Sequence, residues 1–369
     1  MKKNGHLFLT ISRLTSNLLA DYWQDYRWLV LPIAIIVGFI NVLSGQCDCK
    51  EFIYLDEPGG KVHKFEINPA GGSLTEVGGV SGIPWFNNAS VLPFPHGLGV
   101  DRNGFLYIGS NFKEPNQIRK LDCLGNIKPV SEFVAPPSGN WGFGLYNISS
   151  YDGFIYANGT SGQIYKIDPC TGSIIGYVRL SSNSDDWGLH IDKNGKFYVT
   201  QRDGKIYAFT PTAADFTSFT IYSPLIDLGA NPAYVTPAYS GTGLEGITTD
   251  NNGNIYVVEG NRDHINTPSR LLKFSPTGAF IAAGPVDNNG TDNAGWNQMV
   301  GIVYSYSSGK LYTTTLNINE DCMYRWDTSL MPEGAALGPS YSLSLCKSIG
   351  IVTECCPLVA SPSTGQFAV

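Results

Sequence analysis

Charge is scarce in this 369-residue chain. Only 15% of the residues are Asp, Glu, Lys or Arg, against about 25% in an average globular protein. The 24 basic and 31 acidic residues give a net charge of −7 without a basic stripe, so we expect no nucleic-acid partner. Low charge together with 12% aromatic residues also argues against disorder.

Strong helix formers do not dominate the composition either. Glycine occurs 42 times and tyrosine 20 times, and both fill helices poorly. A helical bundle is therefore not expected. The mixture favours many short strands joined by Gly, Asn and Asp turns.

No apolar run reaches the roughly 20 residues that a membrane-spanning helix needs. The longest run, residues 29–43, has Arg27 before it and Ser44-Gly45 after it, which is typical of a secretory signal. We predict a signal peptide over 1–45. Because 28 residues precede the run, an uncleaved amino-terminal anchor is the alternative. Both readings predict a secreted or cell-surface protein.

All eight cysteines follow this leader. An even count in an exported chain favours disulfides, and neither cysteine cluster has the paired C-x2-C spacing of a zinc ribbon. We predict at least one bridge between a cluster near the start and a cluster near the end of the chain. Cys123 and Cys170 could pair with each other or stay free. The bridge candidates are Cys47, Cys49, Cys346, Cys355 and Cys356.

One pattern of four short strands recurs along the chain. Each copy has an innermost strand, an Asp/Asn-Gly turn, a second strand with a tyrosine, a third strand ending in Asp or Ser, and a fourth strand. Alternation with period 2 and tight turns indicate strands, and four strands per copy are the signature of propeller blades. The expected innermost strands are 96–101, 141–146, 187–192, 245–250 and 300–305, and the second-strand tyrosines are Tyr107, Tyr156, Tyr198, Tyr256 and Tyr312.

A sixth copy is split between the two ends of the chain. Residues 51–80 lack the innermost strand, and residues 349–354 (IGIVTE) fit it. The sequence thus predicts an all-β, six-bladed propeller with four strands per blade, in which the carboxy-terminal strand completes the first blade. Closing the ring removes exposed sheet edges. The predicted propeller domain spans 46–356, and 357–369 is a linker or tail that suggests a longer chain.

The motif in residues 246–258, GITTDNNGNIYVV, resembles NHL-type and gluconolactonase-like six-bladed propellers. The Gln46-Cys-Asp-Cys start also resembles exported surface proteins of Bacteroidetes, often the front ends of adhesin-like chains. This resemblance implies a secreted binding propeller for an unknown extracellular ligand, a glycan, small molecule or protein, and a monomeric propeller within a longer chain. The gluconolactonase-like members imply the alternative, a calcium-dependent lactonase or esterase, although their opening Glu-Gly-Pro motif is Glu57-Pro58-Gly59 here.

Catalytic signatures are missing: there is no Gly-x-Ser-x-Gly elbow, His-Glu-x-x-His helix, P-loop or dinucleotide fingerprint. Ligand-binding candidates come instead from the first position of each innermost strand, because related blades bring these residues to one mouth of the central funnel. Aromatic and polar side chains there could bind a small molecule or glycan, or simply pack. The set is His96, Trp141, Trp187, Glu245, Val300 and Ile349.

Symmetry about the turn at Asn252 predicts that Glu245 and Glu259 face each other across a hairpin. Two adjacent carboxylates repel, so a cation such as calcium, with Asn261 or Asp263 as further ligands, or a shared proton would relieve them. Neutralisation by Arg262, or a one-residue bulge that sends the two carboxylates to opposite faces, is the alternative.

Two other histidines and two loops complete the predictions. His63 is expected to face solvent and His190 to be a satisfied core residue. If Trp141 and Trp187 plug the funnel, the long loops Pro224–Gly243 and Asp287–Gln298 are the expected contact surface for a partner.

Overall fold

The protein is described from a computed structural model, in which the described compact unit is Cys49–Glu354. Within the described residues no helix is long and apolar enough to cross a membrane. The predicted leader over 1–45 and the tail 357–369 lie outside them. The structure describes residues 49–77, 85–90, 95–101, 103–110, 118–122, 125–128, 145–159, 162–181, 186–231, 233, 243–260, 269–286, 299–315, 323–337 and 348–354.

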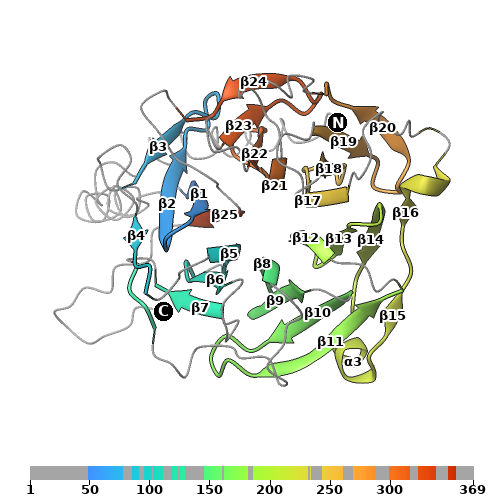
Figure 1. The fold of residues 1–369 in the computed structure, drawn as a ribbon, viewed down its shortest axis with the longest axis horizontal. Coiled ribbons are helices and arrows are strands. Elements are labelled where there is room, and N and C mark those ends of the chain that lie inside the picture. The colour runs from blue at the N-terminus through green and yellow to red at the C-terminus, as the bar shows by residue number, and fades with distance from the viewer. Residues whose placement is uncertain are drawn as a thin grey trace, which may run out of the picture. The chain divides into compact units, whose positions relative to one another are not determined.

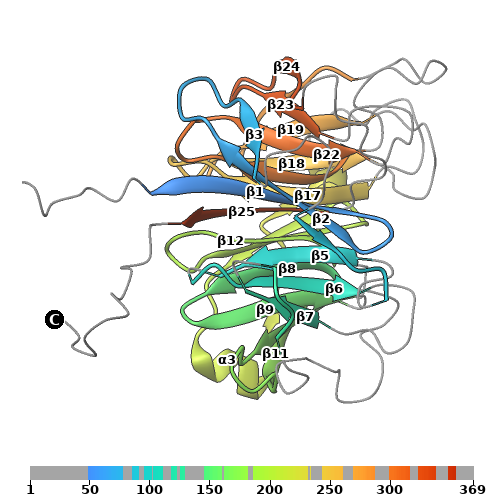
Figure 2. The same ribbon diagram turned by 90° about the vertical axis from the view of Figure 1, so that its left-hand side faces the viewer.

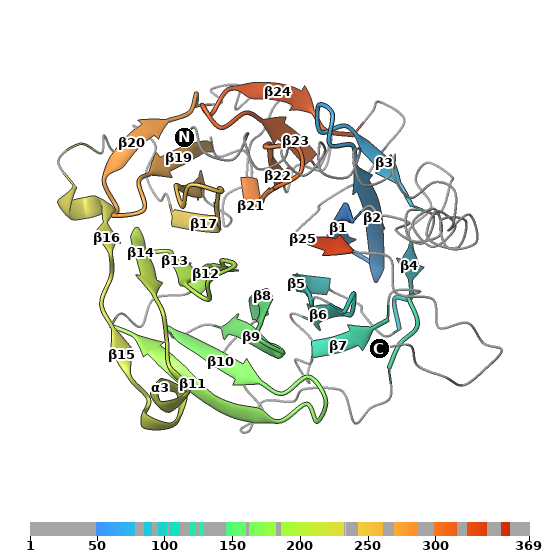
Figure 3. The same ribbon diagram turned by 180° about the vertical axis from the view of Figure 1, so that it is seen from behind.

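Six antiparallel sheets form the unit and are arranged as a ring of blades (Figures 1 and 3). From the innermost strand outward, the first three blades are β25 (Ile349–Glu354), β1 (Lys50–Glu57), β2 (Lys61–Ile67) and β3 (Leu74–Glu76); β5 (Pro95–Val100), β6 (Leu106–Ser110) and β7 (Ile118–Leu121); and β8 (Leu145–Tyr151), β9 (Phe154–Gly159), β10 (Gln163–Ile167) and β11 (Ile174–Leu180).

The remaining three blades repeat this order. They are β12 (Asp186–Ile191), β13 (Phe197–Gln201), β14 (Lys205–Phe209) and β16 (Ile226–Asp227); β17 (Gly243–Thr249), β18 (Ile255–Gly260), β19 (Arg270–Phe274) and β20 (Phe280–Ala283); and β21 (Met299–Tyr304), β22 (Leu311–Thr315), β23 (Met323–Trp326) and β24 (Pro332–Ala335).

Short extra elements decorate the outer edge of the ring. The strand β4 (Phe86–Asn87) pairs with β2, and β15 (Ile221–Tyr222) pairs in parallel with β11. The helix α3 (Ala213–Ser218) lies between β14 and β15 in the sequence and contacts β11 of blade 3, and the 3-10 turn η2 (Leu228–Ala230) follows β16. Because β16 is the fourth strand of blade 4, the predicted loop Pro224–Gly243 is partly regular structure.

The split blade is confirmed. The carboxy-terminal strand β25 pairs with β1 in antiparallel register from Leu55↔Ile349 to Lys50↔Glu354, and the two strands lie side by side in Figure 2. The innermost strands β25, β5, β8, β12, β17 and β21 contact one another in that order and back to β25. The ring is therefore closed by residues from opposite ends of the sequence.

The turn after the innermost strand explains why Asp and Tyr recur together. In blade 5 one Asp250 oxygen accepts hydrogen bonds from the amides of Asn252 and Asn254, and the other accepts one from the Tyr256 hydroxyl at 2.9 Å. The same Asp–Tyr bond joins Asp101 to Tyr107 and Asp192 to Tyr198. The aspartate thus satisfies turn amides that a tight hairpin leaves open.

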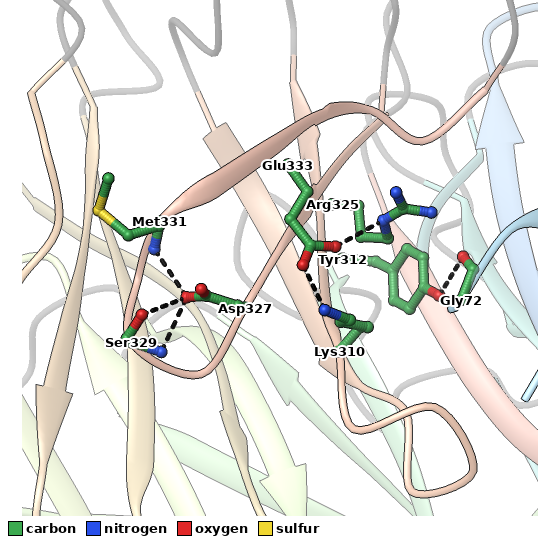
Figure 4. Close-up of polar contacts among 8 residues, drawn as sticks. All are labelled: Gly72, Lys310, Tyr312, Arg325, Asp327, Ser329, Met331 and Glu333. Atoms are coloured by element: carbon green, nitrogen blue, oxygen red, sulfur yellow. Dashed lines mark hydrogen bonds and ion pairs between the residues drawn. The ribbon is translucent and has the colours of Figure 1, made fainter. Parts of the chain in front are cut away.

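Hydrogen bonds of one kind join neighbouring blades at three junctions of the described ring. The Tyr312 hydroxyl of blade 6 donates to the Gly72 carbonyl of blade 1 at 2.6 Å (Figure 4). Lys273 of blade 5 donates to the Thr328 carbonyl of blade 6, and Lys120 of blade 2 to that of Pro169 in blade 3. The acceptors lie in the turn between the third and fourth strands, which Asp327 caps in blade 6 through the Ser329 and Met331 amides (Figure 4).

The core lies between the blades rather than inside a single one. One buried cluster combines Ile53 and Phe65 of blade 1 with Tyr312 and Met323 of blade 6, and comparable clusters join the other neighbouring blades. The side chain of His63 is fully buried, so the prediction that it faces solvent is wrong. Its two ring nitrogens lie 3.0 Å from Glu76 Oε1 and 3.3 Å from Glu57 Oε2.

The innermost strand of blade 3 differs from the prediction. It is β8, Leu145–Tyr151, and not residues 141–146. Tyr151 pairs directly with Phe154, and Asp152 and Gly153 between them have φ values of 48° and 77°, as a two-residue hairpin turn requires. This turn fixes where the strand ends. Trp141 lies outside the described residues.

Candidate functional site

The two ends of the ring are built differently. We call the end with the turns between first and second strands the hairpin end, and the opposite end, where the innermost strands begin, the mouth end. Four of the predicted ligand-binding residues, His96, Trp187, Glu245 and Glu259, belong to the half of the strands nearest the mouth end.

Glu245 and Glu259 do not face each other, so that prediction is wrong. Glu259 pairs with Leu244, and the register shifts between Leu244 and Ile247. This is the one-residue bulge that the sequence left open as an alternative. Because of it, residues counted as equidistant from the turn are one position out of register.

The bulge recurs around the ring. The same shift occurs after Pro95, Leu145, Asp186 and Met299, at the beginning of each innermost strand except β25. A side chain from the second strand satisfies the extra backbone amide: Thr200 Oγ1 accepts from Gly188 N at 2.9 Å, and Thr314 Oγ1 from Gly301 N at 3.1 Å. The Thr200 hydroxyl also donates to the Glu245 carbonyl.

Glu259 is held by an arginine. Arg270, on the adjacent strand β19, pairs with Glu259 and forms a buried ion pair through Nε. The Glu259 residue is only 1% exposed and Arg270 9%. The charge of this carboxylate is thus neutralised within the sheet. The sequence pointed to Arg262 for this role, but that residue lies outside the described part of the chain.

The other mouth residues are also buried. His96 is 2% exposed, Glu245 1% and Trp187 5%, and the Arg202 guanidinium lies 5.2 Å from the centre of the Trp187 ring. Trp187 is therefore a packed residue of the mouth, which agrees with the packing alternative. In blade 1 the residue Ile349 pairs with Leu55, and the equivalent pair in blade 2 is Leu98 with Ile108. Ile349 therefore occupies the strand position of Leu98 and not that of His96.

The calcium site stays a prediction. Asn261 and Asp263, two of its predicted ligands, lie outside the described residues. Among the residues that the structure does describe, no group of three or more His, Cys, Asp or Glu side chains forms a metal-binding cluster.

The cysteine predictions are tested at two positions. Cys170 is a free and exposed thiol, so it does not pair with Cys123. Cys49 is disulfide-bonded, and its partner lies outside the described part of the chain. Its predicted bridge to the carboxy-terminal cluster, Cys346, Cys355 or Cys356, stays a prediction, as does any role of Cys47.

His190 lies in the central channel. Its Nε2 is 3.0 Å from the Thr249 hydroxyl, and the ring is partly exposed. Burial lowers the pKa of His190 to about 4, although Asp192 nearby acts in the opposite direction. The imidazole is therefore neutral at pH 7. It is a channel-lining residue and not the core residue expected from the sequence.

Comparisons with known proteins support the fold. No protein-family model and no curated protein matches the sequence. Among solved structures, a chain from a nidogen/laminin complex matches with a TM-score of 0.55 at 14% identity, over 83% of this chain and 100% of that one. A Lactobacillus plantarum protein matches with a TM-score of 0.54 at 10% identity, over 82% and 99%.

A third match is a Bacteroides caccae protein of unknown function, with a TM-score of 0.50 at 10% identity over 82% of this chain and 99% of that one. Such low identities show the fold alone. Together with the sheet order, they establish the class of the protein, a six-bladed β-propeller.

Proposed function

We propose that the chain is a secreted or cell-surface binding propeller that recognises an extracellular partner with its mouth end. The observation that carries this proposal is the unequal length of the connections at the two ends. At the hairpin end most strands are joined by short turns, such as Asp152-Gly153, and the long connection 210–225 between β14 and β16 is the exception. At the mouth end the turns 58–60 and 202–204 are short, but several connections are long, such as 231–242, 261–269, 284–298 and 336–348. Long connections on a rigid scaffold are where binding residues concentrate.

The described residues at the mouth end are held in place by their neighbours. Trp187 packs under Arg202, Glu259 is bonded to Arg270, and threonine hydroxyls fix the bulges. Buried, satisfied polar groups of this kind hold a backbone in place. The sequence interpretation of the mouth as the ligand-facing end is retained, but with the contacts assigned to the connecting segments instead of to His96, Trp187 and Glu245.

The resemblances are compatible with this role. A propeller of the same fold belongs to a nidogen/laminin complex, and a fold of this kind serves binding as well as catalysis in different proteins. The NHL-type or gluconolactonase-like subtype and the adhesin-like context are part of the proposal and rest on the sequence motifs.

Binding can be tested with the purified protein on a printed glycan array and on immobilised laminin. We expect the wild type to bind at least one probe, and a variant in which a short Gly-Ser linker replaces 287–297 to lose at least tenfold in affinity. The control is Lys193→Ala, an exposed substitution at the hairpin end, which should bind normally.

The opposite result would contradict the proposal: binding that the loop replacement leaves intact, or that Lys193→Ala abolishes. Calcium-dependent hydrolysis of a lactone by the wild type, without binding to either probe, would favour the hydrolase alternative.

A further inference from the structure

The central channel contains a cavity of about 370 Å³ lined by all six innermost strands. Its lining includes the hairpin-end residues Asp192, Lys193 and Tyr306, so it lies toward the hairpin end and away from the mouth-end connections. A cavity of this size is at the lower end of the range of small-molecule sites, with room for on the order of ten waters.

Three polar groups without partners line one side of this cavity. They are the Asn147 amide nitrogen, the Ser149 hydroxyl and the His190 Nδ1, none of which is hydrogen-bonded within the part of the chain that the structure describes. All three residues are partly exposed. The other polar atom of two of these side chains is hydrogen-bonded. Asn147 Oδ1 accepts from the Ile148 amide, and His190 Nε2 is bonded to the Thr249 hydroxyl.

The opposite side of the cavity is mostly apolar, with Thr353 of β25 as a polar residue near the hairpin end. Asn147 and Ser149 belong to β8 and His190 to β12, whereas Val303 belongs to β21 and Ile351 and Val352 to β25. In the ring order β8 lies across from β21 and β12 across from β25 (Figure 1). The cavity therefore has a polar wall facing a mostly apolar wall.

Two carboxylates at this end already accept hydrogen bonds, and the third charged residue of the lining, Lys193, is exposed. Both oxygens of Glu51 accept hydrogen bonds from the turn that follows β21, including 2.7 Å from the Ser307 hydroxyl and 3.1 Å from the Tyr306 amide. Asp192 accepts from the amides of Asn194 and Lys196. His190 is neutral at pH 7 because burial holds its pKa near 4.

From this arrangement we infer that the channel binds a neutral, amphipathic small molecule, which presents a carbonyl or hydroxyl group to Asn147, Ser149 and His190 and an apolar face to Val303, Ile351 and Val352. An ionic ligand would lose its hydration in the cavity, and the lysine of the lining, Lys193, is exposed at the hairpin end, where solvent screens its charge. The site is separate from the proposed mouth-end surface and does not depend on it.

The test uses benzamide as a neutral probe and benzoate and benzylammonium as charged probes of similar shape, followed by saturation-transfer NMR on the full protein. We expect benzamide to bind with a Kd in the millimolar range and the charged probes to bind at least tenfold more weakly. Ser149→Trp should fill the cavity and abolish binding, and Ser149→Val should weaken it several-fold. Thr75→Val, an exposed strand substitution in β3, is the matched control.

The melting temperature shows whether each variant folds. If Ser149→Trp does not fold, the benzamide affinity of Ser149→Val is the deciding measurement. The inference is overturned if benzamide does not bind the wild type, if the charged probes bind equally well, or if the folded Ser149 variant binds like the wild type.

Discussion

The Tyr54 hydroxyl donates a hydrogen bond of 2.7 Å to Glu354, 300 residues away in the sequence. Lys64 Nζ lies 2.8 and 2.9 Å from the two oxygens of the same carboxylate and 4.3 Å from the centre of the Phe52 ring. In blades 2, 4 and 5 a comparable bond joins a tyrosine to an aspartate of its own hairpin. In blade 1 it joins the two ends of the described unit.

Deletion of residues 346–369 removes β25 and with it this bond. We expect aggregation or a large fall in melting temperature, because β1 would become an unpaired edge and the buried Ile349 would be lost. Glu354→Ala alone should cost about 1–3 kcal/mol, since it leaves Lys64 without its carboxylate. Size-exclusion chromatography and thermal melting measure both variants. A deletion variant that stays monomeric and melts like the wild type would disprove closure.

A disulfide should reinforce the same junction. We predict that Cys49, or its neighbour Cys47, is bridged to Cys346, Cys355 or Cys356, which would close a loop of about 300 residues and contribute roughly 5 kcal/mol on the chain-entropy model. Non-reducing peptide mapping by mass spectrometry should find a cross-linked peptide, and reductant should lower the melting temperature. Five free thiols in protein exported by its own host would refute the bridge.

The bulges depend on threonine hydroxyls. Thr200→Val keeps the shape of the side chain but removes the acceptor for Gly188 N and the donor to the Glu245 carbonyl. We expect a loss of about 2 kcal/mol in the free energy of unfolding. Thr200→Ser keeps the hydroxyl and should lose less. Urea denaturation compares the two, and equal stability of both variants would show that the hydroxyl has no such role.

Arg270 should stabilise the folded protein because it neutralises the buried charge of Glu259. Arg270→Met leaves Glu259 buried without its cation, for which we expect a loss of about 3–5 kcal/mol. Adding Glu259→Leu to this variant should restore most of the stability, because it removes the unpaired charge. The comparison is made by chemical denaturation at pH 7. A double variant no more stable than Arg270→Met alone would contradict this view of the pair.

His190 should make the fold sensitive to acid. Its pKa is about 4 in the folded protein and about 6.5 in an unfolded chain. Since the unfolded chain binds the proton more tightly, the stability is fully present above pH 6.5 and falls as the pH drops toward 4.

His190→Gln should abolish that part of the pH dependence, on the order of 2 kcal/mol after allowing for partial exposure of the ring. The free energy of unfolding, measured from pH 4 to pH 7.5 for both proteins, gives the comparison. Parallel profiles for wild type and variant would rule out this role of His190.

The architecture could be predicted from the sequence because each blade repeats a local signal. The alternation of the strands, the Asp-Gly turns and the second-strand tyrosines each have a local physical cause, and segment 349–354 carries the same pattern as the inner strands that it joins. Even the split blade could be recognised, because its missing strand matched the other five.

The site was harder to predict because it depends on register. One extra residue in the bulge makes Glu259 pair with Leu244 instead of Glu245. In blade 3 the Trp-Gly-Phe-Gly motif at 141–144 resembles the start of the other inner strands, although the strand begins later. That misplacement hid Asn147 and Ser149. The two-residue Asp152-Gly153 turn was the signal that could have placed them, because it fixes the end of the strand before it. His63 was misjudged because its two carboxylate partners lie on neighbouring strands.

The most direct test of the proposed function is the location of the binding footprint. Amide hydrogen exchange would be measured on the wild type with and without the probe that binds on the array. We predict slower exchange in the mouth-end connections 231–242, 261–269 and 284–298, with no change in the hairpin-end turns 101–105 and 192–196. Protection confined to the hairpin-end turns would contradict the account.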